Sequence, residues 1–175
     1  GKKYVQEANV IENPTMEVAR ETFDAYHSIM LEMEQTMTHM HNRVNQLQSI
    51  SSQLKRIQAD LTEPTLKETC KRLIQSLKEW DETMVQRKSK AYDDVENFEN
   101  KFSANYLYLI NVTESQIPRV NASSVERKKE LDAAWSKYEA QAAEWLEKDL
   151  KAFNQALWEA GLGAIRLDKG MFQAE

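Results

Sequence analysis

One long, uninterrupted apolar seam constrains this chain more than any other feature. Between Tyr26 and Leu54 the sequence contains neither glycine nor proline, and apolar side chains recur every three or four residues. This spacing places them on one face of a helix, which we predict to run from Met16 to about Ala59, on the order of 65 Å. Thr15 is expected to cap its first turn. The seam residues are Met30, Met33, Met37, Met40, Val44 and Leu47.

The middle of the chain predicts two shorter helices with a break between them. Pro64 interrupts the first helix, and Thr65 with Glu68 has the form of a capping box. A second helix should therefore start there and return along the first until about Arg87. Residues 86–110 then mix aromatic side chains with Asp and Asn, which is typical of a packed, hydrogen-bonded corner. A third apolar seam comprises Phe98, Phe102, Tyr106, Leu109 and Ile110.

The last predicted helix has the broadest apolar face. Ser123 and Glu126 form a capping-box pattern ahead of it, and Gly161 is placed to supply a left-handed cap at its end. Residues 162–167 are expected to tuck back, and residues 168–175 to fray. The apolar face comprises Leu131, Trp135, Tyr138, Ala142, Trp145, Leu146, Leu150, Phe153 and Leu157.

Together these segments predict an all-α, antiparallel bundle of long helices. We favour three legs, in which the second and third helices form a broken middle leg. Four helices side by side are the alternative, if the chain reverses between residues 87 and 97. The bundle is expected to occupy residues 15–162, after a linker or the tail of a preceding domain in residues 1–14 and before a tail in residues 163–175.

Composition narrows the classes of function. The chain has four glycines, three prolines and a net charge of -5 with both signs intermixed, so it lacks the broad basic face that binds nucleic acid. No run approaches the roughly 18 apolar residues that span a bilayer, so we expect no membrane insertion. Cys70 is the only cysteine, which excludes an internal disulfide. Because the chain starts at Gly1 rather than at Met, we expect it to be part of a longer polypeptide.

Several residues are candidates for a metal site or a nucleophile. Asp24 and His27 share a helix face at a spacing that helical bundles use for dinuclear metals, but the chain has no Glu-x-x-His motif. His39 and His41 are two positions apart and should point to different faces. We therefore expect no metal and no cofactor, and we assign Cys70 and the seam methionines to core packing.

The corner holds four acids that could supply the carboxylate pair of a glycoside hydrolase. We interpret them as helix caps and solvated surface groups, and we expect no catalytic residue in this fragment. Asn111 and Asn121 begin glycosylation patterns that we expect to be unused. The four acids are Asp93, Asp94, Glu96 and Glu99.

The corner also carries a resemblance to a known family. It resembles a lysine-containing segment followed by the pattern FQDVxNFPNKLNAQ, found in the C-terminal helical region of bacterial sortilin-like (VPS10-type) proteins that are often labelled glycosyl hydrolases. Asn13-Pro14 and residues 153–162 add to the resemblance, which covers most of residues 13–162. The corner residues that carry it are Lys88, Lys90, Asp94, Val95, Asn97, Phe98, Asn100, Lys101 and Asn105.

The resemblance implies an accessory module without catalytic residues. In the family, a β-propeller with BNR (Asp-box) repeats precedes the helical part and bears the hydrolase label. The expected role is to brace that propeller of the same polypeptide or to bind another protein, in a secreted, periplasmic or envelope-associated bacterial protein. Two alternatives stay open: a contribution to a glycosidase site completed by the propeller, and a free-standing helical adaptor that dimerises through its seam.

Six corner residues are predicted to form a structural motif. Asn97 and Asn105 are expected to bond to the backbone, and Phe98 and Phe102 to anchor the joint between the second and third helices in the core. The six residues are Asp94, Asn97, Phe98, Asn100, Phe102 and Asn105.

Overall fold

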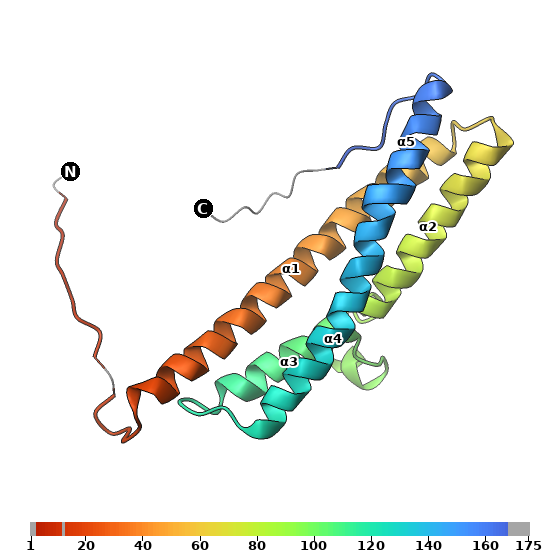
Figure 1. Cartoon of the computed structure of the whole chain (residues 1–175). Helices are drawn as coiled ribbons and strands as arrows, with labels where there is room; N and C mark the ends of the chain where they lie inside the picture. The colour runs from red at the N-terminus through yellow and green to blue at the C-terminus, as the bar shows by residue number, and fades with distance from the viewer. Residues whose placement is uncertain (1–2, 12, 168–175) are drawn as a thin grey trace.

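A computed structural model describes residues 3–11 and 13–167 of the chain (Figure 1). The α-helices are α1 (Arg20–Gln58), α2 (Pro64–Met84), α3 (Phe102–Glu114), α4 (Ala122–Glu144) and α5 (Leu150–Glu159). A 3-10 turn η1 (Tyr92–Glu96) lies between α2 and α3, and a π turn η2 (Trp145–Asp149) joins α4 to α5. These residues form no strand, which confirms the all-α prediction.

The helices form three legs, and the middle leg is broken. Gln48 on α1 bonds to Asp81 near the end of α2, whereas Tyr26 near the start of α1 bonds to Glu114 at the end of α3. A residue early on α1 thus contacts a later residue of the middle leg than a residue further along α1 does. The middle leg, α2 followed by α3, therefore runs antiparallel to α1 (Figure 1). This is the three-legged arrangement with a broken middle leg that we favoured from the sequence.

The third leg, α4 with η2 and α5, runs parallel to α1. Arg43 bonds to Glu139 and Glu32 pairs with Lys128, and the two partners in each pair are 96 positions apart. A constant offset between two helices requires that they point the same way. With 39 residues, α1 is about 58 Å long and spans both parts of the middle leg.

The predicted apolar seams meet in one core. All the seam residues of α1 from Met30 to Leu54 are buried, and Cys70 is fully buried, so their assignment to core packing is confirmed. Because burying one side chain of this size contributes roughly 1.5–3 kcal/mol, the seams supply most of the free energy that holds the legs together. The largest fully buried side chains include Tyr106, Phe153, Met33, Met40, Leu54, Met84 and Leu157.

The predicted start of α1 is wrong by four residues. The helix begins at Arg20, and Thr15 does not cap it. Instead, the side-chain oxygen of Asn13 accepts hydrogen bonds from the backbone nitrogen of Thr15 at 3.0 Å and from its hydroxyl at 2.8 Å. This turn uses the Thr15 hydroxyl and delays the helix.

The predicted capping box of α2 is also wrong, because the helix starts earlier. Glu63 is the N-cap, and its carboxylate accepts from the backbone nitrogens of Thr65 at 2.9 Å and Leu66 at 2.6 Å. These bonds, with that from Thr65 the larger cause, lower the pKa of Glu63. Pro64 fits the first helical position, since its nitrogen needs no partner there.

A similar shift occurs at α4. Asn121 is the N-cap, and its side-chain oxygen accepts from the backbone nitrogen of Ser124 at 2.7 Å. The capping box expected from Ser123 and Glu126 is therefore wrong. In both helices a residue two positions before the expected cap, Glu63 or Asn121, accepts the hydrogen bonds of the free backbone amides.

The end of the third leg follows the prediction. Gly161 has a φ of 76°, and its backbone nitrogen donates to Trp158 while that of Leu162 donates to Leu157 at 2.8 Å, which closes a Schellman cap. The chain then turns back, and Ile165 is buried. Residues 168–175, which were expected to fray, lie outside the described residues.

The π turn η2 was not predicted. Ala142, Leu146 and Leu150 are all buried, so two successive steps of four residues separate the core positions. On an ideal helix these steps would rotate the apolar face by about 80°. The wider π turn absorbs that rotation and keeps α5 facing the core.

Candidate functional site

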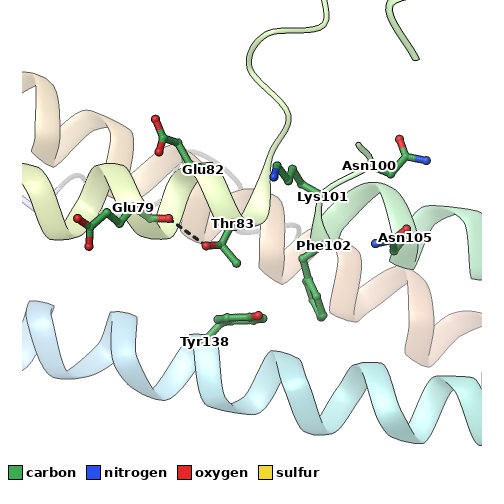
Figure 2. A pocket seen from close by; sticks show the side chains of 8 residues that line it. All are labelled: Glu79, Glu82, Thr83, Asn100, Lys101, Phe102, Asn105 and Tyr138. Atoms are coloured by element: carbon green, nitrogen blue, oxygen red, sulfur yellow. Dashed lines mark hydrogen bonds between the residues drawn. The ribbon is translucent and has the colours of Figure 1, made fainter. Parts of the chain in front are cut away.

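A surface hollow lies where the middle leg breaks. It has a volume of about 460 Å³ and opens to solvent between the end of α2, the start of α3 and the facing side of α4 (Figure 2). Its lining residues are Glu79, Glu82, Thr83, Asn100, Lys101, Phe102, Asn105 and Tyr138.

Two aromatic rings form the inner wall of this hollow. Figure 2 shows Phe102 pointing from α3 toward Tyr138 on α4, and the ring centroids are 5.1 Å apart at an interplanar angle of 69°. Both side chains pack against the buried core. Edge-to-face contact of this kind adds about 0.5–1.5 kcal/mol to simple burial, so the pair fastens α3 to the third leg.

The rim of the hollow is polar and exposed. Glu79 and Glu82 lie on successive turns of α2, and the hydroxyl of Thr83 donates to the backbone oxygen of Glu79 at 3.0 Å (Figure 2). A carboxylate that works as a general acid near neutral pH needs apolar surroundings. This rim offers solvated oxygen acceptors, which can contact the polar groups of a ligand.

The hollow brings together three of the six residues of the predicted motif, namely Asn100, Phe102 and Asn105. Phe98 and Asn97 line a neighbouring hollow of about 310 Å³, which shares Glu82 and Lys101 with the first one. Phe98 is half-buried and, among the described residues, is not one of those packed against the core. The expected pairing of Phe98 with Phe102 as core anchors is therefore corrected to Phe102 alone.

Asp94 holds the 3-10 turn η1 at the joint. One of its carboxylate oxygens accepts from the backbone nitrogens of Lys90 at 2.6 Å and Ala91 at 2.9 Å. These bonds, with that from Lys90 the larger cause, lower the pKa of Asp94. The carboxylate has a local capping role in this structure.

The two asparagines expected to bond to the backbone do not do so through their side chains. Asn97 and Asn105 are exposed, and within residues 3–11 and 13–167 neither side chain has a hydrogen-bond partner. The joint is instead closed by Ser103, whose hydroxyl donates to Met84 at 2.8 Å, and by Gln86, whose amide donates to the backbone oxygen of Glu99 at 2.9 Å. Sequence reasoning missed both, because Ser at a helix start and Gln in a loop carry no distinctive spacing.

A polar network joins all three legs on the α3 side of the bundle. The hydroxyl of the fully buried Tyr106 donates to Asp132 at 2.7 Å, and Lys128 bonds to Asp132 at 2.8 Å and to Glu32 at 3.0 Å. Burial, reinforced by Asp132, raises the pKa of Tyr106. Burial by itself lowers the pKa of Lys128, but the two carboxylates outweigh it and the pKa is raised.

Arg43 and Glu139 make a second link between α1 and α4. The guanidinium uses two nitrogens on the two carboxylate oxygens, one of them at 3.0 Å. His39 lies 3.3 Å from the same carboxylate and meets the ring of Trp135 edge-on. The charges in this link are paired across the helices.

The candidate metal ligands do not lie together. Asp24 and His27 are exposed, and Asp24 lies 3.9 Å from Arg20. Across the part of the chain that the structure describes, no three His, Cys, Asp or Glu side chains are grouped so as to hold a metal ion. Over the same part, none of the helices combines the length and the apolar character that a membrane crossing requires.

The fold and these contacts define the class as an all-α, three-legged helical bundle with a polar joint in its middle leg. Comparison with known proteins adds no relative, since the chain matches no family model, no curated protein and no solved structure.

Proposed function

We propose that the chain is a noncatalytic helical module that braces a neighbouring β-propeller of the same polypeptide, as the resemblance to bacterial sortilin-like proteins implies. The setting we propose is a secreted, periplasmic or envelope-associated protein. The proposal concerns contact with another domain, not a reaction.

The observation that carries the proposal is the segment before α1. Residues 3–11 are extended and lie away from the legs (Figure 1). Their apolar side chains are at least 79% exposed, and Val10 is completely exposed. These side chains are Tyr4, Val5, Val10 and Ile11.

Extended segments with aromatic and β-branched side chains fit the edge of a sheet better than water. A propeller offers short sheet edges on its blades. The segment would add to such an edge through its backbone, and α1, which holds one direction for about 58 Å, would keep the module at a fixed angle.

Association of separately produced domains tests the proposal. The chain should bind the propeller domain encoded in the same polypeptide, and Val10→Asp with Ile11→Asp should abolish binding in isothermal titration. Leu107→Asp, at an exposed site on α3, is the matched control and should bind normally. The proposal is wrong if the wild-type domains do not associate, or if the double substitution changes nothing.

A deletion distinguishes bracing from a share in a glycosidase site. Removing residues 15–162 from the longer protein should lower its thermal midpoint while turnover per folded molecule stays the same. A loss of turnover with unchanged stability would favour the glycosidase alternative.

The adaptor alternative needs the α1 seam to be free. Because the seam from Met30 to Leu54 is buried against the chain's own legs, a dimer through it would require the bundle to open. Light scattering should therefore show a monomer over a wide range of concentrations.

A further inference from the structure

The segment that follows α5 is held by two side-chain amides. On α1, Gln53 accepts a bond from the backbone nitrogen of Arg166 at 2.8 Å and donates one to its backbone oxygen at 3.0 Å. On α5, Asn154 does the same to Ile165, accepting at 2.8 Å and donating at 3.0 Å. Two consecutive residues are therefore held by both of their backbone groups, from two different legs.

This arrangement recognises a backbone in the way that a neighbouring β-strand does. Each amide supplies one donor and one acceptor, so it matches one residue of any extended peptide. Side-chain selection comes mainly from Ile165, which is 5% exposed, whereas Arg166 is exposed and Leu167 is 46% exposed. Leu162, at the start of the segment, is half-buried and also packs against the core. The contacts thus fix an extended shape and one branched aliphatic side chain.

Burial of an apolar tail does not by itself require these four backbone hydrogen bonds. Ile165 alone would cover the core, and water could satisfy the backbone groups on either side of it. The chain instead uses Gln53 and Asn154, which are 101 positions apart, to bond all four groups. Because these bonds depend on backbone shape, a different peptide with the same shape can make them.

From this geometry we propose that Gln53 on α1 and Asn154 on α5, with the core surface beneath Ile165, form a binding groove for an extended peptide with a branched aliphatic residue, and that the chain fills this groove with its own residues 162–167. A tail tethered by the short link after Gly161 has an effective concentration on the order of millimolar, which keeps the groove occupied. Releasing the tail opens the groove to a peptide of the same chemistry from another molecule. The proposal does not depend on the bracing function.

The experiment uses the full chain with Ile165→Asp, since a carboxylate at this buried position drives the tail out. The probe is a fluorescein-labelled peptide, LGAIRL, that reproduces residues 162–167. Fluorescence anisotropy should show saturable binding to the variant and none to wild type at the same concentrations. Adding Asn154→Ala should weaken binding about tenfold, since two hydrogen bonds are lost. Gln155→Ala, at the exposed neighbouring position on α5, is the matched control and should leave binding unchanged.

Two altered probes separate backbone recognition from apolar contact. A peptide methylated on the nitrogen of its isoleucine cannot donate to Asn154 and should bind about tenfold more weakly. A peptide with Asp in place of that isoleucine should not bind.

The proposal is overturned if Ile165→Asp has the helical circular dichroism of wild type but binds no peptide, or if the methylated peptide binds as well as the plain one. If Ile165→Asp does not fold, Arg166→Pro decides the matter. Proline has no backbone N–H, so this substitution removes the donor to Gln53, and it places no charge in the core, since the Arg166 side chain that it replaces is exposed. The variant should therefore bind the plain peptide at concentrations where wild type binds none. A folded Arg166→Pro variant that binds no peptide also overturns the proposal.

Discussion

The two halves of the bundle are held together by different forces. In the polar half, formed by the first part of α1 with α3 and α4, buried hydroxyls and cross-leg ion pairs join the helices. Tyr106 bonds to Asp132, and Lys128 bridges two carboxylates. The hydroxyl of the fully buried Thr113 bonds within α3, to the backbone oxygen of Leu109 at 2.8 Å. In the apolar half, formed by the second part of α1 with α2 and α5, no ion pair among the described residues crosses between legs.

The apolar half depends on burial and on amides. Phe153 and Leu157 on α5 face Leu54 and Cys70 in one core, and each is 2% exposed or less. The polar contacts that cross between legs there have neutral donors. Cys70 donates to the backbone oxygen of Leu54 at 3.4 Å, the indole nitrogen of Trp80 donates to the backbone oxygen of Tyr138 at 3.1 Å, and the amide of Gln48 bonds to Asp81.

The difference follows from the length of the middle leg. α3 has 13 residues against 21 in α2, so the polar half has less apolar surface to bury. Its ion pairs add modest net stability, because desolvation offsets attraction, but they penalise any shift of α4 along α1. We infer that apolar contacts set the stability of the bundle and that polar contacts set the register of its legs.

The largest effect is expected in the apolar half. Phe153→Ala removes a ring that is 2% exposed and should lower the free energy of unfolding by about 3–5 kcal/mol in urea titrations. Trp158→Ala, on the same helix but 75% exposed, is the control and should stay within about 0.5 kcal/mol of wild type. Equal effects would mean that α5 does not face the core as described.

A smaller effect is expected in the polar half. Tyr106→Phe removes the bond to Asp132 but keeps the ring, so it should cost about 1–2 kcal/mol. Tyr108→Phe, where the side chain is 69% exposed, should cost nothing measurable. If Tyr106→Phe lowered the free energy of unfolding as much as Phe153→Ala does, the proposed difference between the two halves would be wrong.

The same tyrosine predicts a pH dependence. Burial first, and then Asp132, raises the folded-state pKa of Tyr106, so the protonated hydroxyl stabilises the fold. This contribution is fully present below the unfolded pKa of about 10 and is lost as pH rises through the higher folded value. Between pH 10 and 11, wild type should therefore lose more stability than Tyr106→Phe, and parallel pH profiles would contradict the assignment.

The ion pairs should matter less than the hydroxyl. A double-mutant cycle on Arg43→Met and Glu139→Gln should give a coupling of about 1 kcal/mol, because the pair is bidentate and its side chains are only 17% and 21% exposed. Lys78 and Glu82, about 60% exposed, form the control pair and should give about 0.3 kcal/mol. Both coupling energies should be smaller in about 1 M salt, and the coupling between Lys78 and Glu82 should vanish.

Within the joint, Phe98 should show a small effect. Phe98→Ala should cost less than about 1 kcal/mol, since the ring is half-buried outside the core. Phe102→Ala should cost more, because it also breaks the contact with Tyr138. Thermal midpoints in which Phe98→Ala is the more damaging change would restore Phe98 as the anchor of the joint.

Helix identity, the buried face and the cap at Gly161 could be predicted from the sequence, whereas the helix starts could not. The seam of α1 depends only on the period of a helix, so Met30 to Leu54 were placed in the core correctly. The starts at Thr15, Thr65 and Ser123 were misplaced, because neighbouring acceptors compete for the same free amides and only three-dimensional geometry decides between them.

The candidate site was less predictable than the fold. Asn100, Phe102 and Asn105 share a hollow because α2 and α3 meet end to end, which no spacing in the sequence encodes. The Arg43 and Glu139 pair, 96 positions apart, depends in the same way on the register of the legs.

The joint in the middle leg shows which features follow from the sequence and which depend on the tertiary structure. The sequence by itself determined that the chain is helical, where its apolar faces lie and that the pattern breaks after α2, because these follow from local period and composition. Only the tertiary structure decided that α3 continues the direction of α2, that Ser103 and Gln86 close the joint, and that Gln53 and Asn154 hold the returning tail. These contacts join residues far apart in the chain, and their energies exist only once the legs have packed.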